Sequence, residues 1–139
     1  PVQWDASANA GFTTGKPWLQ LNPNYREVNA AQALADPDSV FHYYRRLIAL
    51  RKQHPVMVYG RYTLILPEHR EIYAYTRTLG DDRLLVVCNF GAGTPVFQLP
   101  PEVACNSVET LIGNLPSAGT LDLKNWTLRP YEAQVFWLR

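Results

Sequence analysis

The chain has 139 residues, of which 47% are hydrophobic and 18% charged, and its net charge is +1 at pH 7. This composition is typical of one soluble globular domain and excludes a disordered chain. The cations form no basic stripe, which argues against nucleic-acid binding. No apolar run approaches the ~20 residues of a transmembrane helix, so no membrane partner is expected.

The opening segment, residues 1–28, is rich in aromatic residues, glycine and proline but has neither helical nor strand periodicity. The chain starts without a methionine or a signal peptide. We therefore expect a long functional loop held against a larger scaffold outside these residues. Asn22-Pro23-Asn24-Tyr25 predicts a turn, and Asn29 should cap a short helix over 30–35.

The clearest helix follows, with Asp36 or Asp38 as its expected cap and Pro55 as the residue that ends it. Its apolar side chains recur at spacings of three and four along one face, with Arg51 on the same face. This stripe needs a partner that buries it. The residues that carry it are Val40, Phe41, Tyr44, Leu47 and Ile48.

After Pro55 the pattern changes to short extended segments separated by turn residues about every ten positions. Residues 56–66 are predicted to be extended, and Gly80-Asp81-Asp82 predicts a hairpin. The sequence therefore predicts a mainly β protein with an antiparallel β-sandwich at 56–139, preceded by a loop and a helix at 1–55. The other predicted strands are 71–77, 84–90, 96–99, 107–112, 120–123, 126–128 and 132–138.

The two cysteines carry little chemistry. Cys88 lies in the apolar run Leu84–Cys88 and is expected to be a buried free thiol. No Cys/His spacing indicates zinc, so we expect neither a metal nor a cofactor. Free thiols favour a cytoplasmic location.

The acidic and histidine side chains do not assemble a complete active site. Most carboxylates are at helix caps, hairpin tips or strand ends, where a structural role is expected. Asp5, next to Trp4 in the aromatic loop, is the only one in a pocket-like context. The three histidines, His42, His54 and His69, have helix or turn positions. We therefore assign no catalytic residue.

Aromatic residues of the opening segment have two open interpretations. Their rings could stack on the apolar faces of sugars, or they could anchor the loop to a neighbouring domain. The rings concerned are those of Trp4, Phe12, Trp18 and Tyr25.

Several motifs together are familiar. Pro1-Val2-Gln3-Trp4-Asp5, Asn9-Ala10-Gly11-Phe12-Thr13 and Pro17-Trp18 resemble a stretch of the α-glucosidase and oligo-1,6-glucosidase branch of the α-amylase superfamily, glycoside hydrolase family 13. The resemblance continues over essentially the whole chain. It includes Asn22-Pro23-Asn24-Tyr25, Asp36-Pro37-Asp38-Ser39-Val40-Phe41, Tyr43–Arg51 and Leu128-Arg129-Pro130-Tyr131-Glu132-Ala133.

The resemblance implies a chain that ends a larger enzyme. Residues 1–55 look like the loop after the eighth strand and the last helix of a (β/α)8 barrel, and 56–139 like the C-terminal β-sandwich. The barrel of the same parent chain would then be the partner, with an oligosaccharide as its substrate. The family's catalytic carboxylates come from earlier barrel strands, and none maps here. Gln3, Trp4 and Asp5 alone are carried over, as substrate-binding residues at the pocket rim.

Three functions stay open at this point. The first is the inactive C-terminal fragment of a retaining exo-acting α-glucosidase, or of a related trehalose-6-phosphate hydrolase or sucrose isomerase. The second is a carbohydrate-binding module with exposed aromatics such as Trp126 or Tyr73. The third is a purely structural domain that shields the barrel.

Overall fold

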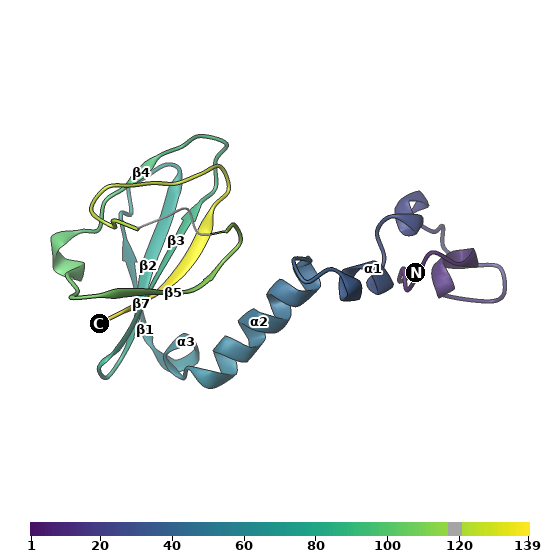
Figure 1. Cartoon of the computed structure of the whole chain (residues 1–139), viewed down its shortest axis with the longest axis horizontal. Coiled ribbons are helices and arrows are strands. Elements are labelled where there is room, and N and C mark those ends of the chain that lie inside the picture. The colour runs from purple at the N-terminus through teal and green to yellow at the C-terminus, as the bar shows by residue number, and fades with distance from the viewer. Residues whose placement is uncertain (117–120) are drawn as a thin grey trace. The chain divides into compact units, whose positions relative to one another are not determined.

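The computed structural model describes residues 1–116 and 121–139. The chain divides into two compact units, Pro1–Ala49 and Leu50–Arg139. The first unit contains short helical elements joined by loops (Figure 1). In chain order these are the 3-10 helices η1 (Ala8–Gly11) and η2 (Pro23–Arg26), the α-helix α1 (Ala30–Ala35), and α2 (Val40–Gln53), whose last residues belong to the second unit.

The helix starts in the first unit follow from capping side chains. Asn29 caps α1 as predicted, because its side chain accepts a hydrogen bond from the Gln32 N–H at 2.9 Å. The predicted turn at Asn22 is the capped start of η2. The expected cap of α2 was wrong: Ser39 Oγ, rather than Asp36 or Asp38, faces the first-turn N–H of His42 at 3.4 Å. Asp36 instead ends α1.

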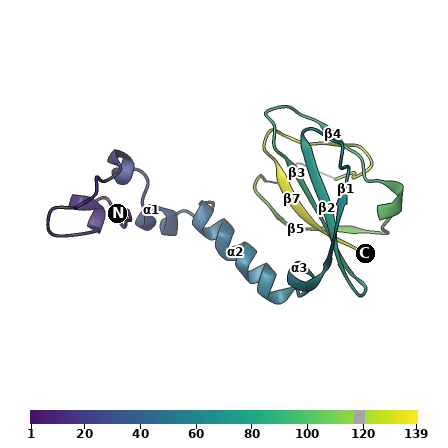
Figure 2. The ribbon, with the colours of Figure 1, turned by 180° about the vertical axis from the view of Figure 1, so that it is seen from behind.

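The second unit is built on an antiparallel sheet of five strands, in the order β1-β2-β3-β7-β5. These strands run side by side in both views (Figures 1 and 2). A smaller sheet pairs β4 with β6. The strands are β1 (Arg61–Ile65), β2 (Ile72–Leu79), β3 (Asp82–Asn89), β4 (Val96–Phe97), β5 (Val108–Gly113), β6 (Trp126–Thr127) and β7 (Ala133–Leu138), and a 3-10 helix, η3, spans Pro101–Val103.

The predicted hairpin between β2 and β3 is confirmed. Leu79 pairs with Asp82, which leaves Gly80 and Asp81 as the two turn residues, and Gly80 has φ +57°. A left-handed φ is what a tight hairpin turn requires and what glycine adopts without strain. The turn fixes the register of the two longest strands.

The core lies between the five-stranded sheet and the small β4–β6 sheet. Phe97 of β4 and Phe136 of β7 are 0% and 1% exposed, and Trp126 of β6 makes edge-to-face contacts with both rings, at 6.1 and 5.5 Å. Side chains of both sheets therefore interdigitate, and the predicted antiparallel sandwich is confirmed. The remaining buried core residues are Ile65, Ile72, Ala74, Leu85, Val87, Val103, Leu123, Leu128 and Leu138.

Two predicted extended segments differ from the structure. The first four residues of the predicted segment 56–66 form a short helix, α3 (Val56–Tyr59), and only β1 is extended. The predicted strand 120–123 begins outside the described residues. Its described part, 121–123, has no strand partner, although the Leu123 carbonyl accepts a hydrogen bond from the Leu99 N–H at 2.8 Å.

The helix α3 exists because tertiary contacts outweigh the β-propensity of Val-Met-Val-Tyr. It packs against β2 and β3, and Val56 is 0% exposed. The guanidinium of Arg77 on β2 donates hydrogen bonds to the carbonyls of Val56, Val58 and Gly60 at 3.1, 3.1 and 2.8 Å. The carbonyls of Val58 and Gly60 are at the helix end, where no internal donor follows, whereas the Val56 carbonyl also accepts a hydrogen bond from the Gly60 N–H at 3.0 Å.

Candidate functional site

The aromatic loop closes on itself through the backbone of Ala10. The N–H groups of Trp4 and Asp5 both donate to the Ala10 carbonyl, at 2.9 and 3.3 Å. Asn9, Ala10 and Gly11 all have positive φ, of +54°, +57° and +64°. Three successive left-handed residues turn the chain sharply, so Ala10 within η1 lies against Trp4 and Asp5.

Asp5 lies inside this turn with an ordered carboxylate. Its Oδ1 accepts hydrogen bonds from the Ser7 N–H at 2.8 Å and the Ser7 hydroxyl at 2.5 Å. These hydrogen bonds hold the pKa of the Asp5 carboxyl below its ordinary value, because they favour the ionised form. A Cβ at Gly11 would lie 2.8 Å from both carboxylate oxygens, so only glycine fits there. Asp5 is thus a fixed anion.

Gln3 ties the loop to the segment that precedes α1. Its Nε2 donates to Asn24 Oδ1 at 3.0 Å and also to the Val28 carbonyl. The carbonyls of Gln3 and Trp4 accept hydrogen bonds from two N–H groups at the start of α1, both at 2.9 Å. The predicted trio of Gln3, Trp4 and Asp5 is therefore held by the same network as the helix start.

The aromatic side chains of the loop remain available for contact. The indoles of Trp4 and Trp18 are 55% and 85% exposed, and the ring of Phe12 is 39% exposed. Tyr25 is half-buried, and the guanidinium of Arg26 lies over its ring, 5.8 Å from the centroid. Both a sugar and a neighbouring domain could use rings presented in this way.

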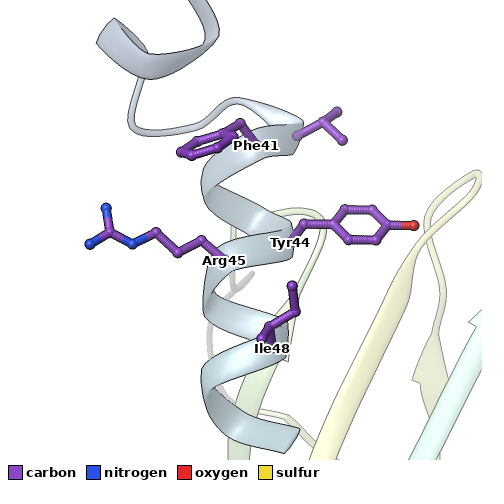
Figure 3. Close-up of a pocket in the computed structure, with 5 residues that line it drawn as sticks. Phe41, Tyr44, Arg45 and Ile48 are labelled. Atoms are coloured by element: carbon purple, nitrogen blue, oxygen red, sulfur yellow. The ribbon is translucent and has the colours of Figure 1, made fainter. Parts of the chain in front are cut away.

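The second exposed feature is one face of the helix α2. Five of its side chains line a shallow hollow of about 480 Å³. Figure 3 shows Phe41 and Arg45 extending to one side of the helix and Tyr44 to the other, with Ile48 one turn below Tyr44. Val40, Tyr44 and Ile48 are 74%, 59% and 50% exposed, so the predicted apolar stripe is present and uncovered in this chain. An almost wholly apolar hollow provides a packing surface and no chemistry.

The histidines have structural contacts. His42 Nε2 lies 3.0 Å from the Leu34 carbonyl, and the ring of His54 packs on Trp137 at 5.0 Å. His69 Nδ1 accepts hydrogen bonds from the N–H groups of Glu71 and Ile72. None of these rings lies in an arrangement that would activate a nucleophile.

The described residues also hold no metal site. Within residues 1–116 and 121–139, no group of three or more His, Cys, Asp or Glu side chains could hold a metal ion. No helix in the same ranges is long and apolar enough to cross a membrane. Cys88 and Cys105 are free thiols, and burial raises the pKa of Cys88. Cys88 was expected to be buried, but it is only half-buried.

Trp126 and Tyr73 were suggested as exposed sugar-binding aromatics of the sandwich, and Trp126 does not have that position. Trp126 is half-buried between Phe97 and Phe136, so it packs the core instead of forming a platform. Tyr73, the other one, is 40% exposed on the opposite face of the large sheet. Its ring contacts those of Tyr75 and Phe90. The alternation Tyr73-Ala74-Tyr75 was the signal for this cluster, because side chains two apart share a strand face.

Comparison with known proteins agrees with this layout. Residues 1–60 match the family described as Alpha amylase, catalytic domain, and residues 62–135 match Maltogenic Amylase, C-terminal domain. The chain is 53% identical over 139 residues to an oligo-1,6-glucosidase of Parageobacillus thermoglucosidasius, covering 100% of this chain and 25% of that protein. It thus spans about a quarter of the length of the curated relatives it matches.

Solved structures give the same coverage. A trehalose-6-phosphate hydrolase of Bacillus licheniformis superposes with a TM-score of 0.88 at 42% identity, covering 99% of this chain and 25% of that chain. A trehalulose synthase superposes with a TM-score of 0.88 at 43% identity, covering 100% and 25%.

Proposed function

Because the chain belongs to the α-amylase family of glycoside hydrolases, we propose that it is the C-terminal part of a retaining, exo-acting α-glucosidase. The parent enzyme would hydrolyse α-glucosidic bonds of short oligosaccharides through two carboxylates located upstream. The observation that carries the proposal is the succession of the two matches, a catalytic-domain segment followed directly by a C-terminal domain. This chain by itself is then inactive and structural.

Residues 1–55 are proposed as the end of the catalytic barrel and 56–139 as the C-terminal domain. The exposed stripe of α2 supports this assignment, because an amphipathic helix with exposed Val, Tyr and Ile side chains needs a covering surface. The rest of the barrel, in the same parent chain, would supply that surface. A cytoplasmic location, predicted from the free thiols of Cys88 and Cys105, belongs to the same proposal.

Gln3, Trp4 and Asp5 are proposed as substrate-binding residues at the rim of the parent's pocket. In support, the loop network fixes their backbone while it leaves the Trp4 indole exposed and the Asp5 carboxylate ionised. An exposed indole packs on the C–H face of a sugar, and a fixed carboxylate accepts hydrogen bonds from its hydroxyls. At barrel ends, loops of this kind surround the chemistry.

The substrate is proposed to be an isomaltose-type oligosaccharide, since relatives with 53% and 49% identity carry the name oligo-1,6-glucosidase. The test compares this chain with a version extended by its upstream coding sequence. The extended protein should hydrolyse isomaltose, and this chain should release nothing from isomaltose or an aryl α-glucoside. Preference for trehalose 6-phosphate, or conversion of sucrose to an isomer, would replace the proposed substrate. Turnover by this chain alone would overturn the proposal.

The rim assignment has its own test in the extended protein, with a matched pair at Asp5. Asp5→Asn keeps the oxygen that accepts from Ser7 but removes the charge, whereas Asp5→Ala removes both. If Asp5 contacts substrate, both variants should raise KM by about 10-fold, because each one removes a charged hydrogen bond to the substrate. A rise for Asp5→Ala alone would make Asp5 a residue that only shapes the loop.

Titration of this chain with maltose and isomaltose addresses the binding-module alternative. We expect no saturable change in Trp fluorescence. Saturable binding that maps to residues 56–139 would favour the carbohydrate-binding module instead.

A further inference from the structure

The outer face of the five-stranded sheet, which faces away from β4 and β6, carries a cluster of aromatic rings. We call Tyr62, Tyr73, Tyr75 and Phe90 the tyrosine patch. The ring of Tyr75 lies 5.1 Å from that of Tyr62 and 5.4 Å from that of Tyr73, and Phe90 lies 6.2 Å from Tyr73. The patch therefore extends over β1, β2 and the residue that directly follows β3.

The patch is exposed and uncharged. Tyr62, Tyr73 and Phe90 are 45%, 40% and 71% exposed. The hydroxyls of Tyr62 and Tyr73 share a hydrogen bond of 3.0 Å, which raises the pKa of Tyr62 to about 12. A hydroxyl that already has a partner costs little to remove from water. A face of this kind is suited to burial against another protein surface.

Part of the sequence that matches the catalytic domain packs on the same face of the sheet. That match extends to residue 60 and so includes α3, which packs on β2 and β3. Arg77, which binds the α3 carbonyls, lies two and four residues along β2 from Tyr75 and Tyr73. Alternation along a strand puts all three side chains on one face. The tyrosine patch is thus continuous with a contact between catalytic-domain and C-terminal-domain sequence.

We propose that the tyrosine patch is the docking surface for the part of the catalytic domain that lies outside this chain. The inference rests on the proposed function, since it needs a parent enzyme. Two facts select this occupant. The chain spans 25% of its relatives' length, so a large catalytic surface is available in them. The only segment of the match that reaches this unit, residues 50–60, contacts this face through α3.

Hydroxyl-radical footprinting tests the proposal directly. The oxidation of Tyr62, Tyr73 and Phe90 is measured by mass spectrometry in this chain and in the extended protein. We expect these three side chains to be oxidised severalfold more slowly in the extended protein. Val96 on β4, which is 45% exposed on the other sheet, is the internal control and should react equally in both. Equal oxidation of the patch in both proteins would overturn the proposal.

Other occupants give different results in the same experiment. Slower oxidation of the patch in this chain at high concentration, without the upstream part, would identify a second copy. Slower oxidation on addition of isomaltose would identify a sugar. Either result would overturn the proposal. Hydrolysis measured on the same samples separates the two ideas: an active extended protein with an unprotected patch refutes the docking surface and leaves the proposed function standing.

A charged variant supplies an independent measurement. Tyr73→Arg should lower the Tm of the extended protein, because docking would bury an unpaired charge. In this chain alone the same change should lower Tm by a smaller amount, because it removes only the contacts with Tyr62, Tyr75 and Phe90 and leaves the new charge in water. Val96→Arg is the matched control and should have little effect in either protein. A Tm loss of the same size in both proteins would contradict the proposal.

Discussion

At the scale of single residues, Glu132 does not have the exposed position that is usual for a carboxylate at the end of a strand. It is 3% exposed. Its two oxygens accept hydrogen bonds from the Arg129 guanidinium at 2.7 and 3.2 Å, from the Arg129 N–H at 2.8 Å and from Gln134 Nε2 at 3.2 Å. Desolvation is the largest influence and opposes ionisation, but these donors together outweigh it and lower the pKa of Glu132.

We expect Glu132→Gln to destabilise the fold by about 1–3 kcal/mol at pH 7, because it removes the buried negative charge that accepts hydrogen bonds from Arg129 and Gln134. The folded-state pKa of Glu132 lies below its ordinary value of 4.5. Its ionised form therefore stabilises the fold above pH 4.5, and the stabilisation is lost as the pH falls through the folded-state pKa. Urea denaturation between pH 7 and pH 3 should show a gap between wild type and variant that narrows at low pH.

The matched control is Glu109→Gln. Glu109 pairs with Arg139 at 3.5 Å, and both side chains are more than 60% exposed. Such a surface pair contributes at most about 1 kcal/mol. If the Glu132 variant behaved like this control at every pH, the buried carboxylate would have no special role in stability.

At the scale of elements, α3 shows how one side chain can stabilise a helix too short to be stable alone. A four-residue segment of Val-Met-Val-Tyr has poor helix propensity. From the neighbouring strand, Arg77 donates to two of its carbonyls, those of Val56 and Val58, and to that of Gly60 just after it. Gly60 is required at the exit, because a Cβ there would lie 2.4 Å from the Val56 carbonyl oxygen.

Arg77→Leu should therefore destabilise the second unit by about 1.5–3 kcal/mol, because it removes hydrogen bonds from a charged donor. The amide of Gly60, which donates to the Val56 carbonyl at 3.0 Å, should exchange with solvent faster. Urea denaturation and amide exchange measure the two effects. Arg77→Lys should rescue only part of the loss, since an ammonium cannot span three carbonyls like the guanidinium fork. Arg70→Leu, at an exposed loop position, is the neutral control.

At the scale of the whole molecule, the two units differ in how much apolar surface they bury. Every residue of the core cluster belongs to Leu50–Arg139. In Pro1–Ala49, Ala10 is the one hydrophobic residue in the buried set, and the α2 stripe is exposed. Burial of apolar surface is the main favourable term in folding, so cooperative stability resides in the second unit.

We expect the chain to unfold with the urea m-value of residues 50–139 alone, because m scales with the surface exposed on unfolding. Amides of residues 1–28 should exchange rapidly, and those of 84–90 slowly. The measurement is amide exchange on monomeric protein, with the oligomeric state checked, since a second copy could cover α2. Equal protection of residues 1–28 and 84–90 in a monomer would contradict this division of stability.

The sequence alone determined the features that depend on local chemistry. Asn29 as a helix cap, the turn at Gly80, the amphipathic stripe of α2 and the closing strand at 132–138 all follow from side chains within a few residues of one another. Motifs such as Gln3-Trp4-Asp5 also carried the family resemblance. These predictions agree with the structure because capping, turn geometry and periodicity act over short stretches of chain.

Only the tertiary structure decided what depends on residues far apart in sequence. Val56–Tyr59 is helical because it packs on β2 and β3 and because Arg77, some twenty positions later, donates further hydrogen bonds to its carbonyls. Trp126 packs into the core, and Tyr73 joins a ring cluster, because of strands that pair across long intervals. Non-local contacts outweigh local propensity when they bury apolar surface or satisfy a helix end, and no short stretch of sequence shows which residue will supply them.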